Sequence, residues 1–539
     1  MSGLVRSSSA AGWALATTSI EREDSCGSQL TAIHQRPSAM VYRQIVRMVA
    51  TLAALPIVTG GAARIVQAQE PVDRAMIARL RAEGEERSQV RETYRVLTDV
   101  IGPRLTGTPG FKRAVDWTRD KLTEWGMSNV SVEAFPFGRG WTLEKLTLEM
   151  TEPRYFPLVG YPEAWTPSTR GMVSGTPVYV GDKTADEIRA LGATLQGAIV
   201  LPQPPQKEFI TADRPQPGDT EQRVRIGAPP TLRSDPKVPF REMMPLLQQL
   251  GAGLVLRPNQ GQHGTIFVLG SYRTRDDAVP SVVLATEHYN MIARLVQHGP
   301  VVKVNAEVRA RYHAADTSGY NVIAEIPGVD PVLRNEVVFL GAHLDSWHSA
   351  TGATDNADAV AAAMEAMRLL KVVGARPRRT IRLALWGGEE QGLLGSRAYV
   401  AKHLEGAANA AARDRISVYL NDDPGLGATY GVYTEENAGA KAIFDAWLAA
   451  LGDSRDLGVK RNPVDKIRNT DHLAFTAVGI PAFTTLKDYR DYDVRTHHTN
   501  TDFFERVGER DLKQSAIVLA VFAWHAAMRE GTFPRAVTQ

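Results

Sequence analysis

Short apolar segments alternate with longer segments of helical periodicity from residue 321 to the end of the chain. The short segments have the length of buried strands, and the longer ones repeat their apolar residues with the period of a helix. Strands joined by helices form βαβ units, whose parallel strands are covered by helices on both faces. We therefore predict a mixed α/β fold with a mainly parallel central sheet flanked by helices. The predicted strands are 321–326, 337–342, 380–386, 416–420 and 480–486, and the predicted helices are 357–373, 393–403, 438–451 and 512–528, with further helices in 71–126 around a turn-rich connector at 102–110.

The middle of the chain has a different pattern. Short β-like segments alternate there with Pro- and Gly-rich loops, and residues 302–310 alternate strictly between apolar and polar side chains, as in a half-buried strand. Residues 207–240 are rich in Pro and Arg and are predicted to form a long surface loop. Because 539 residues are too many for one hydrophobic core, we predict a β-rich insertion at 166–305 within an α/β domain formed by 71–165 and 306–539.

The first seventy residues do not have the pattern of a folded domain. A second methionine, Met40, is followed by Arg43 and Arg47, by an apolar run at 48–63, and by small residues at 66–68. This order is typical of a secretory signal, so we predict a true start at Met40, cleavage after Ala68, and export to the periplasm or the medium. The apolar run is too short and too interrupted to span a membrane stably. A disordered tail with a chance apolar run is the alternative.

The charge and the cysteine content of the chain limit which partners it can bind and which residues can hold a metal. The formal net charge is +2 and no long basic run is present, so nothing indicates binding to nucleic acid. The chain has one cysteine, Cys26, which excludes an intrachain disulfide and a thiolate-rich zinc site. Any metal must therefore be held by histidines and carboxylates.

Polar residues that can bind metal follow several of the predicted strands. In sheets of this kind ligands bind at the carboxyl ends of the strands. Each residue alone has an ordinary explanation, such as a hydrogen-bonded histidine, a solvated loop, a turn or a helix N-cap. The candidates are His343 and Asp345 after 337–342, Asp355 before 357–373, Glu389 and Glu390 after 380–386, Asp423 after 416–420, and His498 in the loop before the last helix.

Taken together, these residues indicate a pair of divalent metal ions. Oxygen and imidazole ligands suit zinc, with manganese or cobalt as alternatives. Glu389 and Glu390 would repel each other if they were buried without a counter-charge. A metal removes this difficulty if one glutamate binds it and its neighbour accepts a proton from water that the metal activates. Three ligands for each ion, with one shared carboxylate, would leave a position open for that water.

A resemblance to a known family is carried by the segments AHLDSW, GATDNADA, RTIRLALWGGEEQGLLGS and HHTNTD. In this order they resemble motifs of the M28 family of co-catalytic zinc peptidases, and within it the carboxypeptidase Q group. The resemblance covers about Ser88 to Met528 and implies the zinc-exopeptidase (phosphorylase-hydrolase-like) fold. The β-rich insertion is similar to the protease-associated (PA) domain that interrupts several M28 enzymes.

The resemblance also implies a role for each candidate. It implies a cis peptide bond after Asp355, and at two places it selects between neighbours, favouring Asp423 over Asp422 and His498 over His497 by position. It implies that His343 and Asp423 bind one zinc ion, Glu390 and His498 bind the other, Asp355 bridges them, Glu389 is the general base, Asp345 orients His343, and Asp471, His472 and His497 lie beside the substrate.

The expected activity is hydrolysis of a peptide bond near a chain terminus, as an aminopeptidase or a dipeptidase acting on peptides or dipeptides. Two alternatives share the fold. One is an acyltransferase that resembles glutaminyl cyclase and uses one metal ion, and the other is a non-catalytic, receptor-like binding protein. The complete set of ligands argues against both. Homodimerisation is implied by the resemblance only.

Overall fold

The computed structural model describes residues 70–214, 237–270, 273, 278–452, 467 and 469–535. The chain divides into two units, 1–67 and 68–539, and all described residues belong to the second. The predicted secretory signal at 40–68 therefore lies outside the described residues. Among the helices that the structure describes, none is long and apolar enough to cross a membrane.

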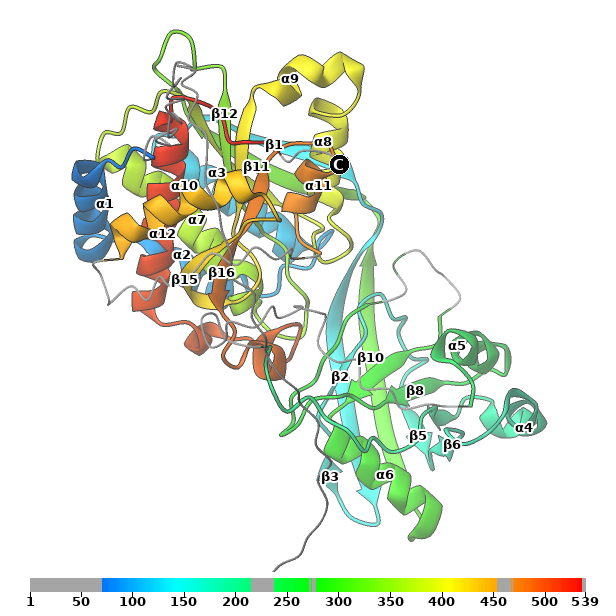
Figure 1. Ribbon diagram of the computed structural model, residues 1–539. Coiled ribbons are helices and arrows are strands. Elements are labelled where there is room, and N and C mark those ends of the chain that lie inside the picture. The colour runs from blue at the N-terminus through cyan, green and yellow to red at the C-terminus, as the bar shows by residue number, and fades with distance from the viewer. Residues whose placement is uncertain are drawn as a thin grey trace, which may run out of the picture. The chain divides into compact units, whose positions relative to one another are not determined.

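A seven-stranded mixed sheet forms the centre of the α/β part (Figure 1). The inner pairs β13–β12, β12–β14 and β14–β16 are parallel, whereas β1–β11, β11–β13 and β16–β15 at the two sides are antiparallel. This confirms the predicted mixed α/β fold, but the sheet has as many antiparallel as parallel pairings and is not mainly parallel, because β1 and β15, which were not predicted, add antiparallel pairs at its two sides. In order across the sheet, the strands are β1 (Ser128–Pro136), β11 (Ser318–Ile326), β13 (Thr380–Trp386), β12 (Val337–His343), β14 (Ile416–Asn421), β16 (Ala482–Asp488) and β15 (Leu426–Tyr433).

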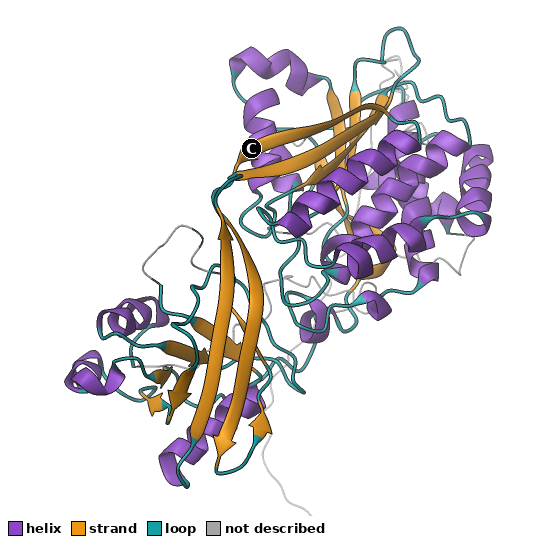
Figure 2. Ribbon diagram, turned by 180° about the vertical axis from the view of Figure 1, so that it is seen from behind, coloured by secondary structure: helices purple, strands orange, loops and turns teal. Residues whose placement is uncertain are grey.

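Helices cover both faces of this sheet, as Figure 2 shows. Strand β12 explains why, because its side chains are apolar on both faces. Val338, Leu340 and Ala342 belong to one buried cluster, and Val337 and Phe339 belong to another. The first cluster includes residues of α1 (Arg74–Glu86), α2 (Val90–Arg95), α3 (Pro109–Glu124), α7 (Asp358–Val372), α10 (Ala438–Leu451) and α12 (Glu509–Met528), and the second includes residues of α8 (Leu394–His403) and α11 (His472–Thr476).

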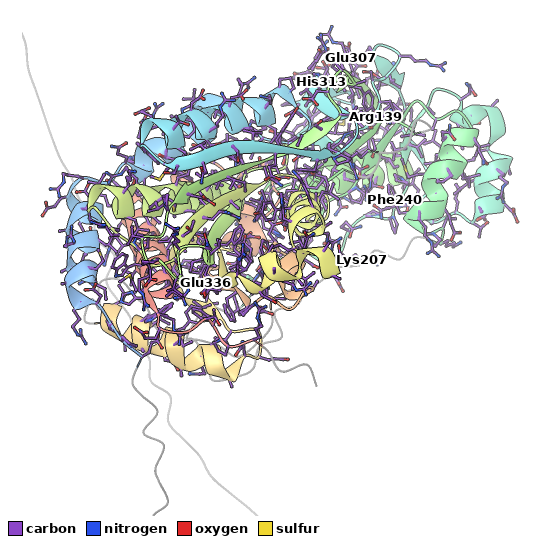
Figure 3. The ribbon with its side chains drawn as sticks, turned by 90° about the horizontal axis from the view of Figure 1, so that it is seen from above. Arg139, Lys207, Phe240, Glu307, His313 and Glu336 are labelled. Atoms are coloured by element: carbon purple, nitrogen blue, oxygen red, sulfur yellow. The ribbon has the colours of Figure 1, made fainter. Side chains whose placement is uncertain are left out.

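A β-rich part of the chain forms two further sheets. The chain enters it after Arg139 and leaves it at His313, which lie near each other in Figure 3, because β2 and β10 pair along their whole lengths. The β-rich pairing thus extends beyond the expected range 166–305. One sheet has the order β3 (Phe156–Pro157), β2 (Gly140–Glu152), β10 (Lys303–His313), β5 (Val173–Gly175), and the other has the order β4 (Gly160–Pro162), β9 (Ser281–Leu284), β8 (Leu254–Arg257), β7 (Ile199–Leu201), β6 (Val178–Tyr179), with helices α4 (Ala185–Ala190), α5 (Phe240–Gln249) and α6 (Thr286–His298).

Two predictions for this part have different outcomes. The strand predicted from alternation at 302–310 is β10, and Val304, Ala306 and Val308 are fully buried on one face, as expected. The segment 207–240 is described only at its ends, and these are not purely surface loop. Ile210 and Val238 are each 5% exposed, because they pack against neighbouring parts of the fold rather than facing solvent.

Candidate metal centre

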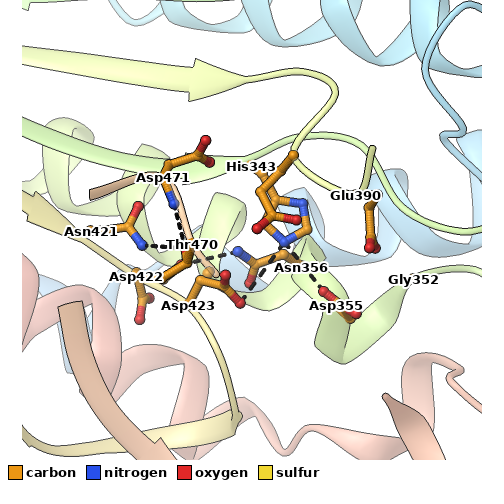
Figure 4. Close-up of polar contacts among 12 residues, drawn as sticks. His343, Gly352, Asp355, Asn356, Glu390, Asn421, Asp422, Asp423, Thr470 and Asp471 are labelled. Atoms are coloured by element: carbon orange, nitrogen blue, oxygen red, sulfur yellow. Dashed lines mark hydrogen bonds and ion pairs between the residues drawn. The ribbon is translucent and has the colours of Figure 1, made fainter. Parts of the chain in front are cut away.

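His343, Asp355, Glu390 and Asp423 come together at one edge of the central sheet, where the parallel strands end (Figure 4), and His498 contacts two of them. His343 is the last residue of β12, Glu390 follows β13, and Asp423 follows β14. Asp355 lies just before α7, and His498 lies in the loop between β16 and α12. Parallel neighbouring strands place their carboxyl ends side by side, which explains why residues so distant in the sequence meet here.

Asp355 lies between the two histidines. Its Oδ1 atom is 3.2 Å from His343 Nε2, and its Oδ2 atom is 3.1 Å from His498 Nε2. Asp423 Oδ1 is 3.9 Å from His343 Nε2, and Glu390 Oε2 is 3.0 Å from His498 Nε2. The site therefore has two halves that share one carboxylate, and each half contains one histidine and one further carboxylate.

The chemistry of this donor set fits metal ions. Ligand atoms of His343, Asp355 and Asp423 lie within 4.8 Å of one another, and so do those of Asp355, His497 and His498. One side-chain atom in each of three predicted ligands is buried and has no hydrogen-bond partner among the described residues: His343 Nε2, Asp355 Oδ2 and Glu390 Oε1. Buried polar atoms are normally satisfied, so their grouping indicates a site for cations.

The pKa values of several predicted ligands are shifted by burial and by their charged neighbours. Burial raises the pKa of Glu390 to about 7, with Asp355 adding to the effect, and burial raises the pKa of Asp423 to about 6. Burial lowers the pKa of His498, but Glu390 and Asp355 outweigh it and raise the pKa to about 10. Without metal, the site therefore holds protons that divalent cations would replace.

Asp345 supports two of its neighbours. Its backbone carbonyl oxygen lies 3.0 Å from His343 Nδ1, and its Oδ1 atom lies 3.6 Å from the same nitrogen. Oδ1 also accepts a hydrogen bond of 3.2 Å from the backbone N–H of Glu389. A contact to the second ring nitrogen leaves Nε2 of His343 directed at the cluster. Asp345 is thus placed to orient His343, mainly through its backbone.

Glu389 lies beside the ligands, although its neighbour Glu390 is the one in contact with His498. Burial raises the pKa of Glu389 well above its ordinary value, and Asp423 and Asp471 add to this against the opposing effect of His343. A carboxylate with raised proton affinity at this position suits the transfer of protons.

Two choices between neighbouring residues can be compared with the geometry. Asp422 faces away from His343: its carboxylate accepts a hydrogen bond from the Thr485 hydroxyl and lies 3.7 Å from Lys487 Nζ. His497 stacks on His498 with ring centroids 3.8 Å apart, and burial lowers the pKa of His497 to about 3. The geometry therefore favours Asp423, and it places His498 in direct contact with both Asp355 and Glu390.

Asp471 and His472 lie at the start of α11 and are fully buried. His472 Nε2 is 3.2 Å from Glu435 Oε1, which is a contact outside the metal-binding groups. Burial raises the pKa of Asp471 to about 7, partly offset by a hydrogen bond from Ser396. The peptide bond between Asp355 and Asn356 is cis, as the resemblance implied.

Sequence reasoning missed several residues that support the ligands. Arg104 is buried and donates hydrogen bonds to the carbonyl oxygens of Leu344 and Gly352, both at 2.8 Å. Asp502 accepts a 2.8 Å hydrogen bond from the backbone N–H of Thr354. Arg104 lies in the connector at 102–110, and Asp502 is the last residue of the segment HHTNTD. The sequence signals that could have identified them were an arginine among turn residues and an aspartate at the end of a motif.

A pocket opens beside the shared carboxylate. Trp347, Ser349 and Thr499 contribute to its wall together with Asp355 and His498. A ligand group that entered it would contact the half of the site that contains His498.

Comparisons with known proteins agree with this picture. Residues 321–523 match the model of Peptidase family M28. The chain is 24% identical to carboxypeptidase Q of Bos taurus over 461 residues, 85% of this chain and 89% of the relative. It is 34% identical to leupeptin-inactivating enzyme 1 of Streptomyces exfoliatus over 174 residues, 32% of this chain and 36% of the relative.

Solved structures show the same fold. A Peptidase M28 precursor from Shewanella amazonensis superposes with a TM-score of 0.65 at 23% identity and covers 86% of this chain and 99% of its own. BSAP, a zinc aminopeptidase from Bacillus subtilis, superposes with a TM-score of 0.55 at 17% identity, over 86% of this chain and 97% of its own.

Proposed function

We propose that this metallo-exopeptidase, whose residues 321–523 match the model of Peptidase family M28, is a two-zinc aminopeptidase or dipeptidase. One observation carries the proposal. The two oxygens of Asp355 face different histidines, Oδ1 toward His343 at 3.2 Å and Oδ2 toward His498 at 3.1 Å. A carboxylate placed in this way can be shared by two cations.

In this proposal His343 and Asp423 would hold one zinc ion, Glu390 and His498 would hold the other, and Asp355 would be available to both. Bound zinc supplies Lewis acidity, which lowers the pKa of water and polarises a substrate carbonyl group. Manganese and cobalt are alternatives, because the same oxygen and imidazole ligands bind them.

Glu389 is the proposed general base. Burial raises the pKa of Glu389 above its ordinary value, which is the direction that a proton-accepting carboxylate requires. It would take a proton from the attacking water and later return a proton to the nitrogen of the leaving amine, so that it ends the cycle unprotonated. The hydrogen bond from its backbone N–H to Asp345 fixes the start of its side chain.

The substrate is a peptide, and we propose that its end enters the pocket beside Asp355 and His498. Asp471 and His472 are proposed to support the substrate site from the side of Glu389, and His497 from behind His498. The β-rich residues 140–313, paired as two sheets, are proposed as the PA-like insertion. Export of the chain, on the basis of the secretory-signal pattern at 40–68, and assembly into a homodimer, on the basis of the resemblance, complete the proposal.

The decisive test is Glu389→Gln. This variant should keep its fold and its bound zinc but lose about 10²–10⁴-fold in kcat, which is the usual range for general acid–base catalysis. Glu405→Gln, an exposed position in the same part of the chain, is the matched control and should match the wild type. Substantial activity in Glu389→Gln would refute the assigned role.

A substrate panel distinguishes the proposed activity from its alternatives. Dipeptides, amino-acid anilides and peptides blocked at either end should be measured with and without a chelator, together with the zinc content. Two zinc ions and chelator-sensitive hydrolysis of peptides with a free end support the proposal. One zinc ion with cyclisation of N-terminal glutamine would indicate the acyltransferase, and neither zinc nor turnover would indicate the receptor-like protein.

A further inference from the structure

His498 and His343 are held in place by different kinds of structure. His343 is the last residue of β12, and both neighbouring strands pair with β12 in the sheet. His498 lies in the loop between β16 and α12, with φ of 59°, in the left-handed region that side chains seldom adopt. Its position must therefore come from contacts that the loop makes elsewhere.

The first of these contacts is a short antiparallel bridge to the β-rich residues. The backbone N–H of Val268 donates to the carbonyl oxygen of His498 at 3.2 Å, and the N–H of Asn500 donates to the carbonyl oxygen of Ile266, also at 3.2 Å. These bonds enclose the pairing of Phe267 with Thr499. The bridge therefore fixes the backbone of His498 itself.

The side chain of Asn500 strengthens the same bridge. Its Oδ1 atom accepts a 2.6 Å hydrogen bond from the backbone N–H of Ile266, and its Nδ2 atom donates to the carbonyl oxygen of Gly264 at 3.2 Å. One asparagine thus ties the loop to two backbone positions of the β-rich part, two residues after the ligand.

The second contact is made by residues 491–494, N-terminal to His498 in the same loop. The guanidinium of Arg214 binds the carboxylate of Asp493 in bidentate geometry, with Nε to Oδ2 at 2.8 Å and Nη2 to Oδ1 at 2.6 Å. The side chains are 11% and 3% exposed. Next to it, the carboxylate of Asp213 accepts hydrogen bonds from the N–H groups of Asp491 and Val494, at 2.7 and 3.0 Å.

The two contacts flank His498 in the sequence, at 491–494 and at 498–500, and both are made with residues 140–313. We propose that this β-rich insertion is a structural part of the metal centre, because it positions His498 through Asn500 and Arg214. The inference rests on the proposed two-zinc site. The ion held by Glu390 and His498 depends on the insertion, whereas the ion held by His343 and Asp423 is fixed by the central sheet.

The experiment measures zinc affinity by competition with a chelator of known strength in the full-length protein. Asn500→Ala and Arg214→Met act on separate contacts, and each should weaken one of the two binding steps by about 10–100-fold, the usual effect of losing a group that supports a ligand. Arg214→Lys should be intermediate, because lysine cannot make the bidentate contact. His498→Ala identifies the step that the two variants should affect.

Lys145→Met is the matched control. Lys145 pairs with Glu307 between β2 and β10, within the insertion but away from the loop that carries His498, and both zinc affinities should stay at the wild-type values. The proposal is overturned if Asn500→Ala and Arg214→Met keep both affinities, or if they weaken both steps equally. A wild-type protein that binds fewer than two zinc ions would instead refute the proposed function on which this inference rests.

Discussion

The ammonium group of Lys487 lies 2.7 Å from Oδ2 of Asp358, and both side chains are buried. Asp422 lies at 3.7 Å from the same ammonium group. Asp358 stands three residues after Asp355, and Asp422 directly precedes Asp423. One cation on β16 therefore connects the two chain segments that bring these carboxylate ligands to the site.

Lys487→Met should destabilise the fold by about 3–5 kcal/mol, because it leaves two carboxylates buried without their cation. Denaturant unfolding of the metal-free protein would measure this. Lys303→Met is the control, since Lys303 pairs with Glu152 at the surface, and such pairs contribute about 0–1 kcal/mol. Equal losses of unfolding free energy in the two variants would show that the buried Lys487 contributes no more to stability than a surface lysine.

Adjacent histidines give a second prediction. His498→Ala should remove one bound zinc ion, because His498 Nε2 contacts both Asp355 and Glu390. His497→Ala should keep both ions and reduce turnover only mildly, since the ring of His497 stacks behind that of His498. The measurement is the zinc content after dialysis. Loss of zinc in His497→Ala but not in His498→Ala would show that His497 is the metal ligand.

Sequence reasoning succeeded where local pattern and topology determine position. His343 and Asp423 could be placed at one edge because each follows an apolar segment that alternates with helices, and parallel strands end side by side. His498 follows no strand directly, and its place depends on contacts with Ile266 and Val268, far away in the sequence. The polar loop made His498 a candidate, and only the resemblance selected it over His497.

Strand β2 shows a different limit. Its partner β10 was predicted from strict alternation. In β2 the apolar residues first occupy odd positions, at Trp141 and Leu143, and then even positions, at Leu146 and Leu148. The pairing shifts between Arg309 and Ala310, so that β2 contains an extra residue there. A bulge of this kind reverses the alternation of apolar and polar side chains along the strand. For this reason a two-residue period did not identify this strand of 13 residues.

Arg104, in the connector at 102–110, gives a third prediction. Its guanidinium is buried and donates to the carbonyl oxygens of Leu344, Thr351 and Gly352, which border the loop before Asp355. Arg104→Met should cost more than about 3 kcal/mol in the free energy of unfolding, since each unsatisfied buried acceptor costs about 1–3 kcal/mol. It should also weaken zinc binding, because the loop loses its support.

Arg104→Lys should recover only part of the loss, because an ammonium group has fewer donors and no planar fork. The control is Arg113→Met on the exposed side of α3, which should change stability by less than about 0.5 kcal/mol. Urea unfolding and chelator competition report the two effects separately. Wild-type stability in Arg104→Met would contradict the prediction.

Removal of metal should destabilise the protein, and the loss should grow as the pH rises from 6 to 8. Without metal, burial raises the pKa of Glu390 to about 7 and that of Asp423 to about 6. The folded state then binds protons that the unfolded chain releases near pH 4. Stability of the metal-free protein therefore falls as the pH rises from about 4 through these folded-state values.

Most other groups of the site agree in direction or act outside this pH range. His497, whose pKa burial lowers to about 3, opposes them only below about pH 6.5, where the histidine of the unfolded chain is protonated. His498, with its pKa raised to about 10 by Glu390 and Asp355 against the effect of burial, also loses its stabilising contribution as the pH rises. Asp355 has a pKa well below its ordinary value, so its contribution is lost only in acid. Metal binding becomes stronger over the same range, because fewer protons compete for the ligands.

Thermal unfolding with and without a chelator at pH 6, 7 and 8 measures this prediction. The difference in Tm between the two forms should widen at each step. Glu390→Gln removes one of the titrating carboxyl groups, so the metal-free variant should depend less on pH between 5 and 7 than the metal-free wild type. A difference in Tm that stays constant or narrows toward pH 8 would show that these buried carboxyl groups do not exchange protons for metal.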